Sequence, residues 1–122
     1  MPIQSYQDLD VWQRGMSLAG QVYRLTKAFP KEEMFGMTSQ MRRAASSIPA
    51  NIAEGWGRQG NKEFQQFLRV AQGSLRELET HLLLSQQVDL TTRDKIDPLL
   101  NETTILSKQL VALQRSLKAR QP

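Results

Sequence analysis

Few side chains in this 122-residue sequence could support catalysis or metal binding. There is no cysteine, which excludes disulfides, thiolate nucleophiles and thiolate metal sites together. The single histidine, His81, follows Glu77 by four residues, whereas helical di-iron sites need two Glu-x-x-His elements and two further glutamates. We therefore predict no metal site and no cofactor.

Two other patterns are weak signals of chemistry. Ser46 and Ser47 stand just before Pro49, where a serine hydroxyl commonly bonds a backbone carbonyl. A nucleophilic serine would also need a base and an oxyanion hole. The run Gly55–Gly60 has neither the spacing of a Walker loop nor a preceding strand, so it indicates a connector. With no catalytic residue assigned, we expect a protein that is not an enzyme.

These side chains must be positioned by helices, because apolar residues recur at helical spacing in four segments and strand-like alternation is absent. The first segment begins after Asp8 or Asp10 and ends at Phe29, and the second begins near Thr38 or Ser39 and ends at Gly55. The third segment begins at Asn61 and ends before Gln87, and the fourth begins at Thr91. Short connections predict one all-α domain over residues 1–122, an antiparallel up-down-up-down four-helix bundle with frayed ends at about 1–6 and 118–122.

Three residues are unusual for helix interiors. Pro49 removes a backbone hydrogen bond and clashes with the preceding turn, so we expect the second helix to be kinked or broken there. Pro98 would be tolerated if the fourth helix began nearer Asp97, which would place it in the first turn. Gly73 costs about 1 kcal/mol relative to alanine, which suggests close approach of a neighbouring helix.

The first helix carries two apolar stripes about 100° apart. One consists of Trp12, Met16, Ala19 and Tyr23, and the other of Val11, Leu18, Val22, Leu25 and Phe29. Together they exceed what one bundle core needs, which favours a second buried face between protomers. The alternative is that the outer stripe packs under the loop from Phe29 to Gly36. We assign the candidate oligomer interface to Val11, Leu18, Val22 and Leu25.

The net charge of +4 and pI near 9.8 are compatible with a phosphate-bearing partner. The candidate nucleic-acid-binding residues are Arg42, Arg43, Arg58, Lys62 and Arg69. The alternative is that these cations pair with glutamates of the same bundle. From Thr103 to Pro122 there are four basic residues and no acid, which fits either the helix dipole or a phosphate-binding tail.

The sequence gives no indication of export or membrane insertion. Residues 1–6 lack the basic and apolar regions of a secretory signal. The longest apolar runs, such as Leu82–Leu84, are far below the roughly 20 residues of a membrane span. We therefore expect a cytoplasmic protein.

Several motifs resemble one bacterial family, the four-helix-bundle proteins encoded by intervening sequences in 23S ribosomal RNA genes. They are Asp8–Gln13, Val22-Tyr23, Phe29-Pro30, Glu33–Gly36, Ser39–Gly55, Phe64, Phe67-Leu68, Ala71, Gly73-Ser74 and Glu77–Thr80. The resemblance covers about residues 6–117 and implies an antiparallel bundle that assembles as a ring-like homopentamer. It also implies kinship with the accessory variability determinant of diversity-generating retroelements, which binds a reverse transcriptase and nucleic acid through a positive surface.

Two functions from different classes follow from these observations. The first is a non-enzymatic homo-oligomeric scaffold or adaptor, pentameric by resemblance, whose basic surface binds RNA or DNA together with a protein partner such as a reverse transcriptase. The second is an oligomer that interacts with proteins alone and carries its positive charge incidentally.

Overall fold

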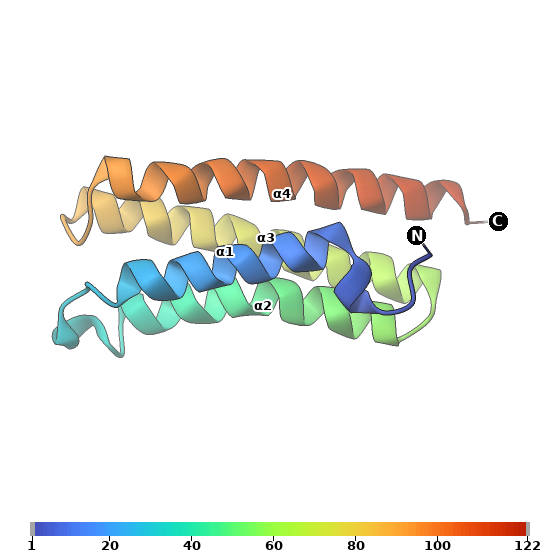
Figure 1. Cartoon of the computed structure of the whole chain (residues 1–122), viewed down its shortest axis with the longest axis horizontal. Coiled ribbons are helices and arrows are strands. Elements are labelled where there is room, and N and C mark those ends of the chain that lie inside the picture. Colours follow the sequence, from blue (N-terminus) through green and yellow to red (C-terminus); the bar gives the residue numbers. More distant parts are fainter. Residues whose placement is uncertain (1, 122) are drawn as a thin grey trace.

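The structure, a computed structural model, describes residues 2–121 and contains four long helices and two short 3-10 turns. In chain order these are η1 Tyr6–Asp8, α1 Asp10–Thr26, η2 Lys31–Glu33, α2 Met37–Gly57, α3 Asn61–Gln87 and α4 Arg93–Ala119. No strand occurs in residues 2–121, so the prediction of an all-α four-helix bundle is confirmed. In Figure 1 the helices lie side by side, the chain direction reverses from each helix to the next, and both termini lie at the same end.

The helices pack around a closed square. Helix α1 packs beside α2 and α4, and α3 packs beside the same two helices, while in residues 2–121 no Cα atoms of the diagonal pairs, α1 with α3 and α2 with α4, come within 8 Å of each other. The outer surface shared by α1 and α2 therefore lies opposite the one shared by α3 and α4. This placement matters because the outer surface of α1 and α2 carries apolar side chains, whereas that of α3 and α4 carries basic ones.

The core is formed by the apolar stripes predicted for the last three helices, together with one stripe of α1. Its largest fully buried side chains are Leu18, Val22, Met41, Ile48, Ile52, Leu68, Leu75, Leu78, Leu82, Ile96, Leu106 and Leu110. Burial of each such side chain contributes roughly 1.5–3 kcal/mol relative to exposure. Phe67 and Leu113, which also lie at helical spacing in the third and fourth segments, are only partly buried.

Helix α2 runs without interruption through Pro49, so the predicted break is wrong and only the kink stays a prediction. The pyrrolidine ring is buried against α1, where a Cβ added to Gly15 would lie 3.5 Å from the Pro49 Cβ atom. The Ser46 hydroxyl donates to the Arg43 carbonyl at 3.3 Å, as expected for a serine beside a helical proline.

Helix α4 begins at Arg93, four residues before the alternative start near Asp97, so Pro98 lies inside the helix. Thr92 occupies the N-cap position. A hydrogen bond from the Thr92 side chain, with one from the backbone of Asp94 itself, lowers the pKa of the Asp94 carboxyl below its ordinary value of 3.8. This negative charge lies in the first turn, where it complements the helix dipole.

Of the predicted frayed ends, Met1 and Pro122 lie outside the described residues.

The glycine that allows close packing is Gly55 and not Gly73. A Cβ added to Gly55 would lie 2.6 Å from the Phe67 Cβ atom, closer than real Cβ contacts occur. At Gly73, nothing in the described part of the chain lies within 4 Å of an added Cβ. The prediction of close helix approach at Gly73 is therefore wrong.

We predict that Gly73→Ala raises the free energy of unfolding by up to about 1 kcal/mol, because alanine restricts the unfolded chain and meets no obstacle on α3. Gly55→Ala is the matched comparison, and we expect it to destabilise the bundle through its clash with Phe67. Urea unfolding followed by circular dichroism measures both. Equal effects of the two substitutions would contradict the assignment of Gly55 as the close-packing position.

Candidate interaction surfaces

An apolar groove runs along the outer surface shared by α1 and α2. It encloses about 440 Å³ and is lined by Tyr6, Trp12, Met16, Ala19, Gly20, Tyr23, Ser46, Pro49, Ala50 and Ala53. Met16 is 48% exposed and Tyr23 is 43% exposed, although both are large and largely apolar. The groove is therefore a candidate contact surface.

The structure reverses the roles predicted for the two stripes of α1. Val11, Leu18 and Val22 are 5%, 0% and 0% exposed, so they belong to the core of the monomer. Their assignment to an oligomer interface is wrong, because a buried side chain cannot meet a second protomer. Leu25 is partly buried against the core. Both stripes have helical spacing, and spacing alone does not tell which one faces the other helices.

In the other stripe, Ala19 is 8% exposed and Trp12 is partly buried against the core, and the residues that face outward are Met16 and Tyr23. The loop between α1 and α2 leaves both side chains exposed, so it does not cover the outer stripe as the alternative expectation held. The N-terminal end of the groove is partly covered, because Tyr6 of η1 packs edge-on against Trp12 with ring centroids 5.3 Å apart.

Arg42, one of the predicted nucleic-acid-binding residues, joins α2 to the end of α1. Its Nε donates to the Thr26 hydroxyl at 2.8 Å and its Nη2 donates to the Tyr23 carbonyl at 3.4 Å. The guanidinium carbon also lies 4.6 Å from the centroid of the Tyr23 ring. These contacts give Arg42 a structural role in holding two helices together.

The other predicted cations differ in their surroundings. Arg58 pairs with Glu54 at 3.2 Å, and its guanidinium lies 5.3 Å from the centroid of the Phe67 ring. No ion pair joins Arg43, Lys62 or Arg69 to a carboxylate in residues 2–121. Lys62 and Arg69 are seven residues apart, which places them on the same face of α3.

The row on α3 continues to Arg76, another seven residues along, and Arg76 reaches across to α4. Its Nη2 donates to the Ser107 hydroxyl at 2.9 Å, and its Nη1 pairs with Glu79 at 2.9 Å. Near the C-terminal end of α4, Asn61 Nδ2 donates to the Leu117 carbonyl at 3.0 Å. These bonds show which positions of α3 and α4 lie next to each other.

The neighbouring positions on α4 are also basic. Lys108 directly follows Ser107, Lys118 directly follows Leu117, and the exposed Arg115 lies seven residues after Lys108. We call these residues the basic α3–α4 face: Lys62, Arg69, Arg76, Lys108, Arg115 and Lys118. The sequence alone did not predict that the basic residues of α4 belong to the same surface as those of α3. The absence of acidic residues from Thr103 to Pro122 can be seen in the sequence, but the position of this stretch beside α3 is known only from the fold.

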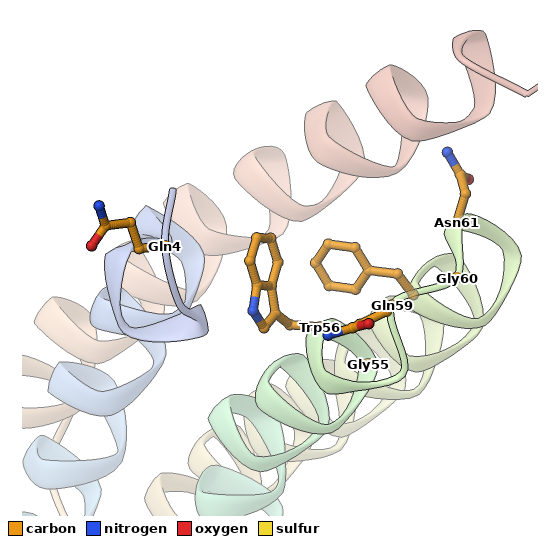
Figure 2. Close-up of a pocket in the computed structure, with 7 residues that line it drawn as sticks. Gln4, Gly55, Trp56, Gln59, Gly60 and Asn61 are labelled. Atoms are coloured by element: carbon orange, nitrogen blue, oxygen red, sulfur yellow. The ribbon is translucent and has the colours of Figure 1, made fainter. Parts of the chain in front are cut away.

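A separate pocket of about 350 Å³ lies at the bundle end that carries both chain termini. The lining includes Trp56 and Phe64, and Figure 2 shows Trp56 between Gln4 on one side and Asn61 on the other. The two aromatic rings meet edge to face, with centroids 6.1 Å apart. None of the seven lining side chains is titratable in the physiological range, so the lining offers aromatic and amide contacts but no acid or base.

His81, the remaining candidate for chemistry, lies close to one acidic side chain. His81 Nε2 lies 3.4 Å from a Glu77 carboxylate oxygen, and the His81 side chain is 14% exposed. The described residues contain no group of three histidine, cysteine or acidic side chains that could hold a metal ion. Across residues 2–121, no helix combines the length and apolarity needed to cross a membrane.

Comparison with known proteins agrees with this architecture. Residues 7–112 match the family model described as 23S rRNA-intervening sequence protein, which confirms the resemblance. A crystal structure from Bacteroides thetaiotaomicron, of a protein of unknown function from the S23 ribosomal protein family, matches with a TM-score of 0.76. It is 25% identical, and the match covers 85% of this chain and 97% of that one. No curated protein matches.

We predict that Arg42→Ala lowers the free energy of unfolding by about 1–2 kcal/mol, because it removes hydrogen bonds to Thr26 and Tyr23 and the packing on the tyrosine ring. The neighbouring Arg43→Ala is the control, and we expect a change within about 0.5 kcal/mol because Arg43 forms no ion pair in the described chain. Urea unfolding compares the two variants. A smaller loss of stability for Arg42→Ala than for Arg43→Ala would contradict the structural role of Arg42.

Proposed function

The chain belongs to the 23S rRNA-intervening sequence protein family, and within that family we propose that it is a non-enzymatic homo-oligomeric scaffold that binds RNA or DNA. One observation carries this proposal. The bundle has an exposed apolar groove on the α1–α2 side and a row of cations on the opposite, α3–α4 side. One side is suited to contacts between copies and the other to phosphate.

Self-association is supported by the composition of the groove. Met16 and Tyr23 are about half exposed, and small residues such as Gly20, Ala50 and Ala53 leave room between the two helices. Covering such surface contributes about 25 cal/mol for each Å² of apolar area removed from water. The groove therefore favours a contact between copies, and the assembly that we propose is the homopentameric ring implied by the family resemblance.

Nucleic-acid binding is supported by the spacing and freedom of the cations. Residues seven apart on a helix are about 10.5 Å apart along its axis, and packed helices are about 8–10 Å apart. The basic α3–α4 face therefore spreads positive charge over a surface that several phosphates could contact at once. Among its residues only Arg76 forms an ion pair in the described part of the chain. Arg76 also donates to the Ser107 hydroxyl, so it is the one cation of this face with side-chain partners for its guanidinium among the hydrogen bonds and ion pairs described above.

The two activities fit together because they use opposite sides of the bundle. A neighbouring copy on the α1–α2 groove leaves α3 and α4 accessible, so each added copy adds one more basic surface to the assembly. The bundle needs no catalytic residues for such a role.

The first test is the mass of the particle in solution. We expect light scattering at micromolar concentration to give a multiple of the 13.9 kDa chain mass. Met16→Glu should shift the particle toward the monomer, with association weaker by about tenfold or more, because it places an unpaired charge in the interface. Val70→Glu is the matched control, since Val70 is 47% exposed on α3, away from the groove. A wild-type monomer at these concentrations would overturn the oligomer.

The second test is nucleic-acid binding across a salt series, followed by anisotropy of labelled RNA and DNA. We expect affinity to fall steeply with salt, and the double variant Lys108→Gln, Arg115→Gln to reduce the slope by about 2, roughly one for each phosphate that is no longer neutralised. Lys27→Gln, Lys95→Gln removes the same charge from positions outside the basic α3–α4 face and should keep the wild-type slope. Absence of binding at low salt would leave an oligomer that contacts proteins alone.

A further inference from the structure

The most exposed large apolar side chain in the described chain is Phe35, in the loop between α1 and α2. It is 96% exposed, and the preceding Met34 is 47% exposed. Isolated apolar residues on a surface are ordinary, but an aromatic ring with almost no intramolecular contact is not. Such a ring gains nothing from folding the monomer, so its burial would have to come from another molecule.

The loop that carries Phe35 is held in place by hydrogen bonds. The Met34 amide donates to the Lys31 carbonyl at 3.0 Å, and the Gly36 amide donates to the Glu33 carbonyl at 3.0 Å. The Met37 amide, at the start of α2, donates to a Glu33 side-chain oxygen at 3.2 Å. Phe35 therefore projects from a structured turn, so a partner that buries it has less conformational entropy to overcome.

We infer that Phe35 of one copy docks in the α1–α2 groove of a second copy. This inference rests on the proposed self-association and identifies the two surfaces that meet. The groove has the volume and lining for an aromatic ring, with small residues at Gly20, Ala50 and Ala53 and the adaptable Met16 side chain beside them. Edge-to-face contact with Trp12 or Tyr23 would add to the buried area.

Charge complementarity favours a second copy as the occupant. The Arg24 guanidinium lies over Gly20 of the groove, with Nη1 3.4 Å from the position of an added Cβ. The Arg42 guanidinium lies over the Tyr23 ring, also part of the groove. Neither arginine forms an ion pair with a carboxylate of residues 2–121. The border of the groove near Gly20 and Tyr23 is therefore cationic.

The turn that presents Phe35, residues 30–36, contains two glutamates and one lysine, Lys31, so its net charge is −1, opposite in sign to the border of the groove. Glu32 and Glu33 lie directly before Met34 and Phe35, and Glu32 is exposed. Neither glutamate is joined to a cation by an ion pair in the part of the chain that the structure describes. An acidic turn that presents an aromatic ring thus matches an apolar groove with a cationic border, and each copy carries one of each.

A contact of this kind is heterologous, because a loop on one copy meets a groove on the next. Heterologous contacts repeat from copy to copy and give closed rings when the rotation between neighbours closes. The inferred contact is therefore compatible with the ring proposed above, and it lies away from the basic α3–α4 face.

The first experiment compares Phe35→Ala with Val88→Ala by light scattering and sedimentation of the full chain. Both residues are exposed, so neither substitution should unfold the bundle. We expect Phe35→Ala to weaken self-association by about tenfold or more, as for a central aromatic of an interface, and Val88→Ala to leave it unchanged. If the wild type associates and Phe35→Ala associates equally well, the docking contact is overturned while the scaffold proposal stands. A monomeric wild type overturns both.

The second experiment mixes two variants that should each be monomeric. Phe35→Asp keeps an intact groove, and Met16→Glu keeps an intact loop, so an equimolar mixture should form one good contact and give a 1:1 heterodimer. If each variant is monomeric and the mixture stays monomeric, Phe35 does not dock in the groove.

A charge exchange checks the polar half of the contact. We expect Glu32→Arg to weaken association several-fold and a further Arg24→Glu in the same chain to restore it. If Arg24→Glu deepens the loss caused by Glu32→Arg, the proposed pairing of the loop with the cationic border is overturned.

Discussion

The close packing of α2 against α3 is the contact on which the rest of the arrangement depends. At one end, Gly55 has no side chain, so Phe67 and Phe64 of α3 can lie directly against the α2 backbone. Midway, the Ser47 and Ser74 hydroxyls are 2.7 Å apart and share a hydrogen bond between the two helices. These contacts fix how the two helices are aligned along their length. The same contacts also fix which side of each helix faces the other, and hence the direction in which the remaining residues of both helices face.

The other two helices are then attached through polar bridges at the edges of the core. Helix α4 is joined to α3 through the Ser107 hydroxyl, which accepts from both Gln72 and Arg76. Helix α1 is joined to α2 by Arg42 and to α4 by Arg14, which contacts Glu102 and Gln109. Burial of leucine and isoleucine supplies most of the stability, but it is not directional. The polar bridges specify which residues of neighbouring helices lie side by side, and hence which residues share an outer face.

Periodicity predicts much of this fold, and its failures have identifiable causes. The stripes of the last three helices point correctly to core residues such as Met41, Leu68 and Leu106, because each helix has a single apolar side. Helix α1 has two such sides, and spacing cannot tell that Leu18 faces inward while Met16 faces outward. A glycine inside a helix suggests close packing, yet the close approach occurs at Gly55, near the end of its helix, where a glycine has an ordinary explanation as a terminator.

The candidate surfaces are predictable only in part, for a related reason. Lys62 and Arg69 can be chosen from sequence, since they follow helical spacing within one basic segment. Arg42 cannot be separated from them, because its contacts with Thr26 and Tyr23 arise from residues distant in sequence. Lys108 and Arg115 have an adequate explanation in the helix dipole. Only the packing of α4 beside α3 makes them part of a shared basic face.

Assembly and charge reinforce each other in such a design. A face with a few exposed cations binds a phosphate backbone weakly, and physiological salt weakens it further. When several copies are held together, the first phosphate contact raises the effective concentration of the remaining ones, so modest faces combine into tight binding. The apolar groove on α1 and α2 would then be functional even though it contacts no nucleic acid. The exposed Met16 and Tyr23 would then act indirectly, because the contact that they make between copies determines how many basic faces act together.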